Sequence, residues 1–334
     1  MSIFGLYFAL HYAAQPGDID YLVNARPHER PPQFRFALDT WIRQRDYRLA
    51  AALPAWRSKV TLMKHRMGGS RCAPVLAVVA MLALSTCPMP ATPQAVADPW
   101  PALQTSLFPG KKLEPAPFIH VTAPTRAASG DQVPFAFSID HPMTANNYIK
   151  SVTLLVDANP VPLAAVFHFA PESGKAEIST RIRFDTDSPV HVVAESNDGK
   201  LYVTAVTVKA SGGCGGSVSG DDPAVMAAAG KMKMALGAPM RVGELNKARL
   251  LIRHPMYTGL QRNLTTNGFR PAYFIQKVAV SYNGKPVMVA NTSIGISENP
   301  TLEFGFVPDG PGALTAVLED NTGATYRQSI DVGG

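Results

Sequence analysis

Residues 201–217 read LYVTAVTVKASGGCGGS, a strand-like run that leads straight into one cysteine between two pairs of glycines. Alternating β-branched and aromatic residues are typical of a strand. Glycine has no Cβ and leaves the Cys214 thiol uncrowded, whereas a structural cysteine is normally wrapped in bulky apolar side chains. We therefore expect an exposed thiol on a flexible segment. The flexibility is expected to come from Gly212, Gly213, Gly215 and Gly216. The alternative is a linker in which the cysteine has no role.

The chain before this segment has the pattern of a β-sandwich. Apolar or alternating runs recur every 8–12 residues and are separated by Pro, Gly, Asn and Asp, which favours an immunoglobulin-like fold of short strands. One helical turn is expected around residues 102–108. The predicted strands are Ile119–Val121, Gln132–Ile139, Ile149–Val156, Ala165–Phe169, Ala176–Phe184, Val190–Glu195 and Leu201–Lys209.

The pattern then repeats in the second half of the chain. His141-Pro142-Met143 recurs as His254-Pro255-Met256, and the latter is followed by an extra loop before Phe274. The sequence predicts an all-β protein of two immunoglobulin-like antiparallel sandwiches, residues 98–210 and 240–334, each with its own core. Residues 211–239 are expected to form a Gly-rich, Cys-bearing linker. Its Asp-Pro start and its Gly stop predict a short helix over 221–230.

The first 97 residues have the features of a leader. A basic stretch at 64–71, an apolar run at 73–84 and Ala95-Val96-Ala97 predict a signal peptide over 63–97 that is cleaved after Ala97. The apolar run is shorter than the roughly 20 residues of a membrane-spanning helix. Residues 1–62 are interpreted as an extension from a mis-assigned start. The mature protein is then expected in the periplasm and not in a membrane.

Charge and cysteine counts limit the possible functions. The net charge of +6 lies in the leader, because residues 1–97 carry 11 Lys and Arg against 5 Asp and Glu, whereas residues 98–334 carry 20 of each. Nucleic acid is therefore not an expected partner. Cleavage removes Cys72 and Cys87 and leaves Cys214 as the one cysteine. An unpaired thiol in an oxidising compartment suggests that the thiol is used.

Cys214 could take part in two other kinds of chemistry. A nucleophilic enzyme would need a histidine base, and no histidine lies near Cys214 in sequence. A Cu(I) site could combine Cys214 with neighbouring thioether ligands, although such methionines also fill gaps in a core. These methionines are Met226, Met232, Met234 and Met240. We predict no catalytic residue, no metal site and no cofactor, and keep Cu(I) binding as the alternative.

The strand that runs into Gly212–Gly216 resembles the end of SoxY, the sulfur-binding subunit of the thiosulfate-oxidation carrier. The second half resembles its partner, SoxZ, in several short motifs. These are His254-Pro255-Met256 with Thr258-Gly259, Pro271–Ile275, Asn283-Gly284, Ser297–Pro300 with Phe304, and Asp320–Gly323. A single chain that joins both is similar to the fused SoxYZ-like carriers associated with quinoprotein dehydrogenases.

The resemblance implies a covalent carrier and not a turnover enzyme. It implies that Cys214 is conjugated to a sulfur species and that the glycine arm presents this cargo to periplasmic sulfur-oxidation enzymes or enzymes of a quinoprotein dehydrogenase system. It also implies that the second domain is a structural and docking partner and not a catalyst. In SoxY the cysteine motif ends the chain, whereas here the chain continues past Ser217, so a looped arm has to enter the partner's site.

Overall fold

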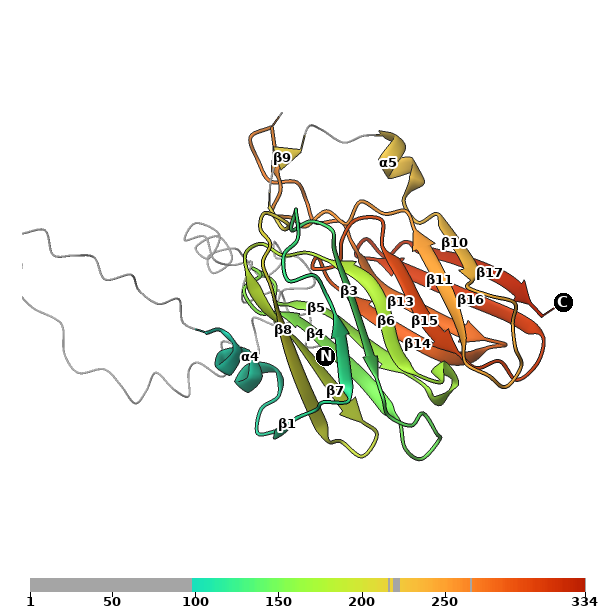
Figure 1. The fold of residues 1–334 in the computed structure, drawn as a ribbon. Coiled ribbons are helices and arrows are strands. Elements are labelled where there is room, and N and C mark those ends of the chain that lie inside the picture. The colour runs from blue at the N-terminus through green and yellow to red at the C-terminus, as the bar shows by residue number, and fades with distance from the viewer. Residues whose placement is uncertain (1–97, 216, 219–222, 265, 334) are drawn as a thin grey trace, which may run out of the picture. The chain divides into compact units, whose positions relative to one another are not determined.

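The computed structural model of the protein describes residues 98–333 apart from 216, 219–222 and 265. The leader predicted over 63–97 and the extension 1–62 lie outside the described residues. Two large sheets make up the fold (Figure 1). One has nine strands in the order β1-β8-β7-β4-β5-β14-β13-β16-β17, and the other has six in the order β10-β11-β15-β6-β3-β2.

The first half of the chain forms the expected short strands. Their alternating apolar residues point into the core, as in Val133–Ile139, whose odd-numbered side chains are all buried. The elements of this half are α4 (Trp100–Leu107), β1 (Leu113–Pro115), β2 (Ile119–Thr122), β3 (Val133–Ile139), β4 (Ile149–Val156), β5 (Leu163–Phe169), η1 (Pro171–Ser173), β6 (Ala176–Ile182), β7 (Ser188–Ser196) and β8 (Leu201–Val208). The prediction of an all-β sandwich with one short helix near its start is confirmed.

The second half repeats this arrangement after a short helix. The elements are β9 (Ser217–Val218), α5 (Pro223–Ala228), β10 (Met232–Leu236), β11 (Asn246–Ile252), β12 (Arg262–Asn263), β13 (Ile275–Tyr282), β14 (Lys285–Thr292), β15 (Thr301–Phe306), β16 (Gly312–Asp320) and β17 (Thr325–Val332). α5 lies within the predicted helix, and the chain leaves it at Gly230 with a φ of 82°. β10 falls inside the range expected for the linker and places Met234 in the core.

The two halves are joined edge to edge. β5 pairs antiparallel with β14 in the nine-stranded sheet, and β6 pairs antiparallel with β15 in the six-stranded sheet. On either side of these junctions the strand order of one half mirrors that of the other, so β8-β7-β4-β5 corresponds to β17-β16-β13-β14. The repeat seen in the sequence is therefore a pseudo-twofold arrangement of two related halves.

One continuous cluster of buried side chains fills the space between the sheets. It includes Phe135 and Phe167 from the first half as well as Phe304 and Leu250 from the second. The expectation that each sandwich buries its own core is therefore wrong. The reason is that pairing at β5–β14 and β6–β15 makes each large sheet continuous, so the apolar inner faces of both halves meet.

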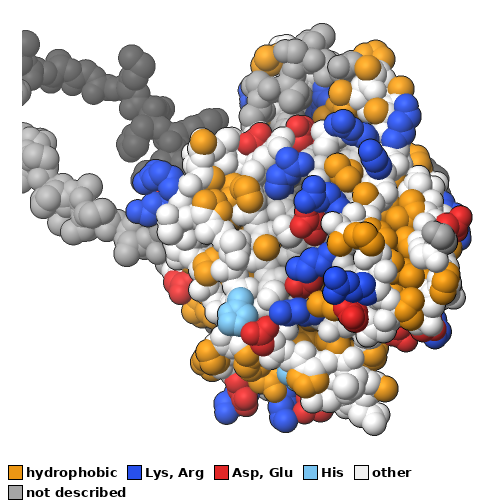
Figure 2. Space-filling view, turned by 45° about the vertical axis from the view of Figure 1, so that its right-hand side comes forward, with side chains coloured by type: hydrophobic (Ala, Val, Ile, Leu, Met, Phe, Trp, Pro, Cys, Tyr) orange, Lys and Arg blue, Asp and Glu red, His pale blue; other side chains and the backbone are white. Residues whose placement is uncertain are grey.

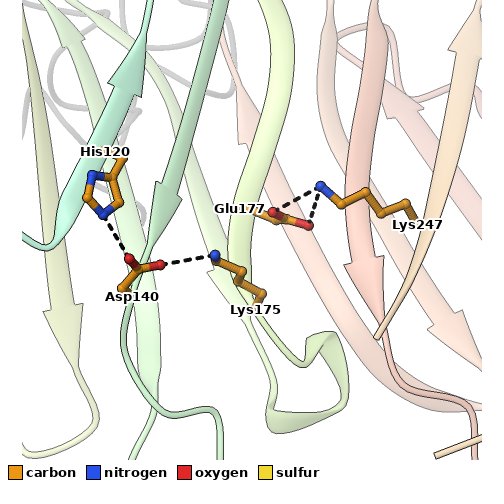
Figure 3. Close-up of polar contacts among 5 residues, drawn as sticks. All are labelled: His120, Asp140, Lys175, Glu177 and Lys247. Carbon is orange, nitrogen blue, oxygen red and sulfur yellow. Dashed lines mark hydrogen bonds and ion pairs between the residues drawn. The ribbon is translucent and has the colours of Figure 1, made fainter. Parts of the chain in front are cut away.

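Ion pairs cross the outer face of the six-stranded sheet (Figure 3). His120 Nε2 lies 2.8 Å from Asp140 Oδ2, and Lys175 Nζ lies 3.0 Å from Asp140 Oδ1. Lys247 on β11 reaches Glu177 on β6 at 3.3 Å, so one of these pairs links the two halves. Hydrogen bonds from Lys175 and His120 hold the pKa of Asp140 below its usual value.

Within the described part of the chain no helix is long and apolar enough to cross a membrane.

Candidate functional site: the cysteine pocket

Cys214 is buried at the end of the first half, where the residue is 2% exposed, and we call its surroundings the cysteine pocket. The prediction of an exposed thiol is therefore wrong for this conformation. Burial and, to a smaller extent, the charge of Asp185 raise the pKa of the thiol to about 12, and the charge of Arg183 opposes this shift. The thiol is consequently protonated at neutral pH and unreactive as a nucleophile where it lies.

The glycines before Cys214 allow close packing of the backbone. A Cβ on Gly213 would lie 2.0 Å from the carbonyl oxygen of Gly130, which leaves no room for any other residue. Gly212 has a φ of 76°, a conformation that favours glycine. Hydrogen bonds from Gly213 N to Phe184 O (2.8 Å) and from Gly212 N to Asp185 O (3.0 Å) fix this stretch. In this conformation Gly212 and Gly213 are part of the sandwich and not of a free arm.

The glycines after Cys214 have different surroundings. A Cβ on Gly215 would meet no atom within 4 Å, so space does not require glycine there. Gly216 lies outside the described residues. The flexibility predicted for the segment therefore stays a prediction on this side of the cysteine.

Arg183 joins three segments around the pocket. It is 4% exposed and donates from Nη1 to Gly213 O (3.0 Å), from Nη2 to Met256 O (3.2 Å) and from Nε to Ile296 O (3.3 Å). A guanidinium that is satisfied by carbonyl groups brings a buried positive charge close to Cys214. Sequence analysis missed Arg183. The available signal was a charged residue between Ile182 and Phe184 in a predicted core strand, because arginine is rarely buried without partners.

The extra loop of the second half holds the cysteine segment from the other side. Thr258 Oγ1 donates to Cys214 O at 2.7 Å, and the same hydroxyl accepts a hydrogen bond from Leu260 N at 3.1 Å. Further along this loop, β12 pairs in parallel with β9, so Arg262 lies opposite Ser217. The cysteine is therefore buried between the two halves of the chain, in what we call the stowed state, and the loop covers it on the outside.

The second His-Pro-Met corner forms another part of this region. His254 and Met256 are 1% and 0% exposed, and Met256 has a φ of 49°, which is uncommon for a residue with a side chain. His254 Nδ1 accepts a hydrogen bond from Met256 N at 3.2 Å, so Nε2 carries the proton of the neutral ring. Burial lowers the pKa of His254 to about 4. No hydrogen-bond partner for Nε2 is present among the described residues.

The other histidines have their own partners. His120 pairs with Asp140, and His191 Nδ1 lies 2.8 Å from Asp157 Oδ2 and stacks on Trp100 of α4 at 3.6 Å. His141 Nδ1 donates to Pro142 O, and His168 contacts Asn291. Across the described ranges no histidine makes a hydrogen bond with Cys214. None of the histidines in the described part of the chain is therefore placed to take the proton of this thiol.

The methionines that follow Cys214 take part in packing. Met234 is buried in the core, Met232 and Met240 pack against it, and Met226 on α5 is 40% exposed. These positions match the use of methionine as a filler of apolar gaps. In the described part of the chain no three His, Cys, Asp or Glu side chains are grouped to hold a metal ion.

Comparison with known families divides the chain at the same place as the repeat. Residues 104–214 match the family described as sulfur oxidation protein SoxY, and residues 234–331 match the family described as sulphur oxidation protein SoxZ. The SoxY match ends at Cys214 itself. No curated protein matches the chain significantly.

Several solved structures are similar to parts of the chain. The sulfur carrier protein SoxY from Chlorobium limicola f thiosulfatophilum is 24% identical over 33% of this chain and 90% of that one, with a TM-score of 0.29. A superoxide reductase from Ignicoccus hospitalis is 16% identical over 28% and 79%, with a TM-score of 0.25. Fibronectin(III)-like modules of Clostridium thermocellum CbhA are 15% identical over 64% and 93%, with a TM-score of 0.19.

The family matches agree with the sequence repeat and with the two related halves of the fold. A SoxY unit and a SoxZ unit follow one another in a single polypeptide, and together they account for most of the described residues. The chain therefore belongs to the fused SoxYZ-like sulfur carriers.

Proposed function

We propose that the protein is exported and that Cys214 carries a covalently bound sulfur species to partner enzymes. The observation that carries this proposal is the match to SoxY, which ends at the cysteine between two pairs of glycines. Export is supported by the leader features at 63–97, and cleavage after Ala97 would leave Cys214 as the one cysteine. The protein itself acts as a shuttle and not as a catalyst.

The burial of Cys214 means that a carrier needs two conformations, the stowed state and one in which the cysteine is presented to a partner. With a pKa of about 12 the buried thiol resists oxidants and alkylating agents, which suits an unloaded carrier in an oxidising compartment. Loading then requires the segment to leave the pocket. The side-chain contacts that have to break are Arg183 to Gly213 O and Thr258 to Cys214 O, and the β9–β12 pairing has to open as well.

The partners are sulfur-oxidation enzymes, and a quinoprotein dehydrogenase system is the second candidate. The continuation of the chain past Ser217 supports a partner whose active site is wide enough for a loop. α5 and the second half follow the cysteine segment in the chain, so this segment is joined to the protein at both of its ends when it leaves the pocket.

Intact-mass analysis of protein isolated from its native host tests the proposal. We expect a mass increase that reductant removes, together with an N-terminus at Asp98. The Cys214→Ser variant from the same host is the control and should lack the added mass. Absence of any reducible adduct on Cys214 under sulfur-oxidising growth would overturn the carrier function.

A further inference from the structure

The outer face of β10 and β11 carries an unusual group of positive charges. β10 is the edge strand of the six-stranded sheet and pairs antiparallel with β11. Arg253 N donates to Lys231 O at 2.8 Å, so Lys231 and Arg253 lie directly opposite one another. Two residues further along, Lys233 lies opposite Leu251 on the same face. We call Lys231, Lys233 and Arg253 the basic cluster.

The basic cluster differs from its neighbours on the same sheet in having no ion pair within the described ranges. Arg249 on β11 pairs with Glu303, and Lys247 pairs with Glu177 (Figure 3). Like charges placed directly opposite across two strands are destabilising. The fold therefore gains nothing from placing Lys231 against Arg253, which indicates a use outside the fold.

Exposed apolar side chains border the basic cluster. Leu251 is 41% exposed on the same face, and Val225 and Met226 on α5 are 39% and 40% exposed. α5 directly precedes the cluster in the chain, and Lys231 N donates to Ala228 O at 3.1 Å in the turn that ends the helix. Figure 2 shows Lys and Arg side chains beside hydrophobic ones toward the top of this face. Apolar residues surrounded by charge are typical of protein–protein interfaces.

The basic cluster is also close to the cysteine pocket. Arg253 precedes Met256 by three residues, a span of at most about 11 Å. The Met256 carbonyl and the Gly213 carbonyl both accept hydrogen bonds from Arg183. An enzyme that takes Cys214 into its active site would therefore cover this part of the surface.

We propose that the basic cluster, with Leu251 and α5, is the docking surface for an acidic patch on the enzyme that receives the cysteine segment. This rests on the proposed function for the identity of the partner. Electrostatic complementarity of this kind mainly accelerates association and makes it sensitive to salt. An edge-strand lysine can also serve to prevent edge-to-edge aggregation, and the test has to separate the two roles.

The test uses the full chain with Lys231→Glu, Lys233→Glu and Arg253→Glu together, and the purified sulfur-oxidation enzyme of the same host as the probe. We expect the association rate constant at about 20 mM salt to fall by about 10-fold or more, and the difference to shrink at about 200 mM salt. The matched control is Lys111→Glu, Lys112→Glu and Lys200→Glu. This control changes the net charge by the same amount as the triple variant, but at positions near α4, β1 and the β7–β8 turn.

Three results would overturn the docking surface. An equal loss of rate in the matched control would assign the effect to net charge alone. The glutamates of the triple variant keep the edge strand charged. If this variant nevertheless self-associates, the native cluster serves to prevent edge-to-edge aggregation of the sheet. Salt-dependent binding to phosphatidylglycerol vesicles, with no effect of the triple variant on the enzyme, would assign it to membrane attachment.

The result is separable from that of the carrier function. Docking through the basic cluster needs no thiol, so Cys214→Ser should associate with the enzyme at the rate of the unchanged protein. If no reducible adduct is found on Cys214 but docking still depends on the basic cluster and on salt, the carrier function is refuted and the docking surface is supported. If the adduct is present but the triple variant docks at the normal rate, the carrier function is supported and the docking surface is refuted.

Discussion

The two His-Pro-Met corners show how one sequence pattern serves two purposes. In the first half, His141 is partly exposed and its Nδ1 donates to Pro142 O. In the second half, His254 and Met256 are buried, Met256 has a positive φ, and its carbonyl accepts a hydrogen bond from Arg183 beside Cys214. The difference shows that the repeat preserves the fold, whereas the second corner has become part of the cysteine pocket.

The largest expected effect tests whether the second corner and its neighbours enclose the thiol. In a chain with Cys72→Ser and Cys87→Ser, iodoacetamide should alkylate native Cys214 at pH 8 about 1000-fold more slowly than the urea-unfolded chain. The reason is that burial raises the pKa of Cys214 from 9.0 to about 12. Rates that agree within about tenfold would mean that the pocket is mostly open in solution.

Truncation of the two methionines compares the corners directly. Met256→Ala should lower the free energy of unfolding by about 2–5 kcal/mol, because it leaves a cavity at a fully buried site. The partly buried Met143 is the matched position, and Met143→Ala should cost less than about 1 kcal/mol. Urea unfolding measures both changes, and equal losses would contradict the contrast.

Acid should destabilise the buried corner that contains His254. The pKa of His254 is about 4 in the folded chain against an ordinary value of 6.5, so the unfolded chain binds the proton first. The stability that depends on neutral His254 is present above pH 6.5 and is lost as the pH falls toward 4, by up to about 3 kcal/mol. Urea unfolding at several pH values should show this loss, and His254→Asn should reduce it.

The control for this titration is His141→Asn, which replaces the matching histidine of the exposed corner. Its unfolding is measured over the same pH range. If both substitutions flattened the slope equally, the acid sensitivity would not belong to the buried corner.

The smallest effect concerns the threonine that follows each corner. Thr258→Val removes the hydrogen bond to Cys214 O, which contributes on the order of 1 kcal/mol, and should speed alkylation of native Cys214 by about 5-fold. Thr144→Val is the control, because Thr144 Oγ1 donates only within its own turn, to Asn147 O. A faster reaction in the control would show that general loosening of the chain, and not the Thr258 contact, sets the rate.

The strands and the repeat could be predicted from the sequence because each is a local pattern. The apolar run Ile149–Val156 forms a strand with the predicted limits, and the recurring corners indicated the relation between the halves. The merging of the sheets could not be predicted. Periodicity states which side chains face inward, but it does not state which edge strands meet, and β5 pairs with β14 more than 100 residues away.

The candidate site was predicted in part. Cys214 is identified by its glycine neighbours, and the family match ends there. Its burial depends on contacts that are distant in sequence, namely Arg183, Thr258 and the close approach of Gly130 to Gly213. Glycine is compatible with both flexibility and tight packing, so composition alone could not distinguish a free arm from a stowed one.

The edge-to-edge pairing of β5 with β14 has a consequence for how the protein behaves at low abundance. If the two halves were separate molecules, the same pairing would be an intermolecular contact and would weaken on dilution. A single polypeptide fixes the ratio of the halves at one to one and supplies each with its partner at a high effective concentration. The two halves of this carrier are therefore joined when the chain is synthesised, and they do not need to meet by diffusion.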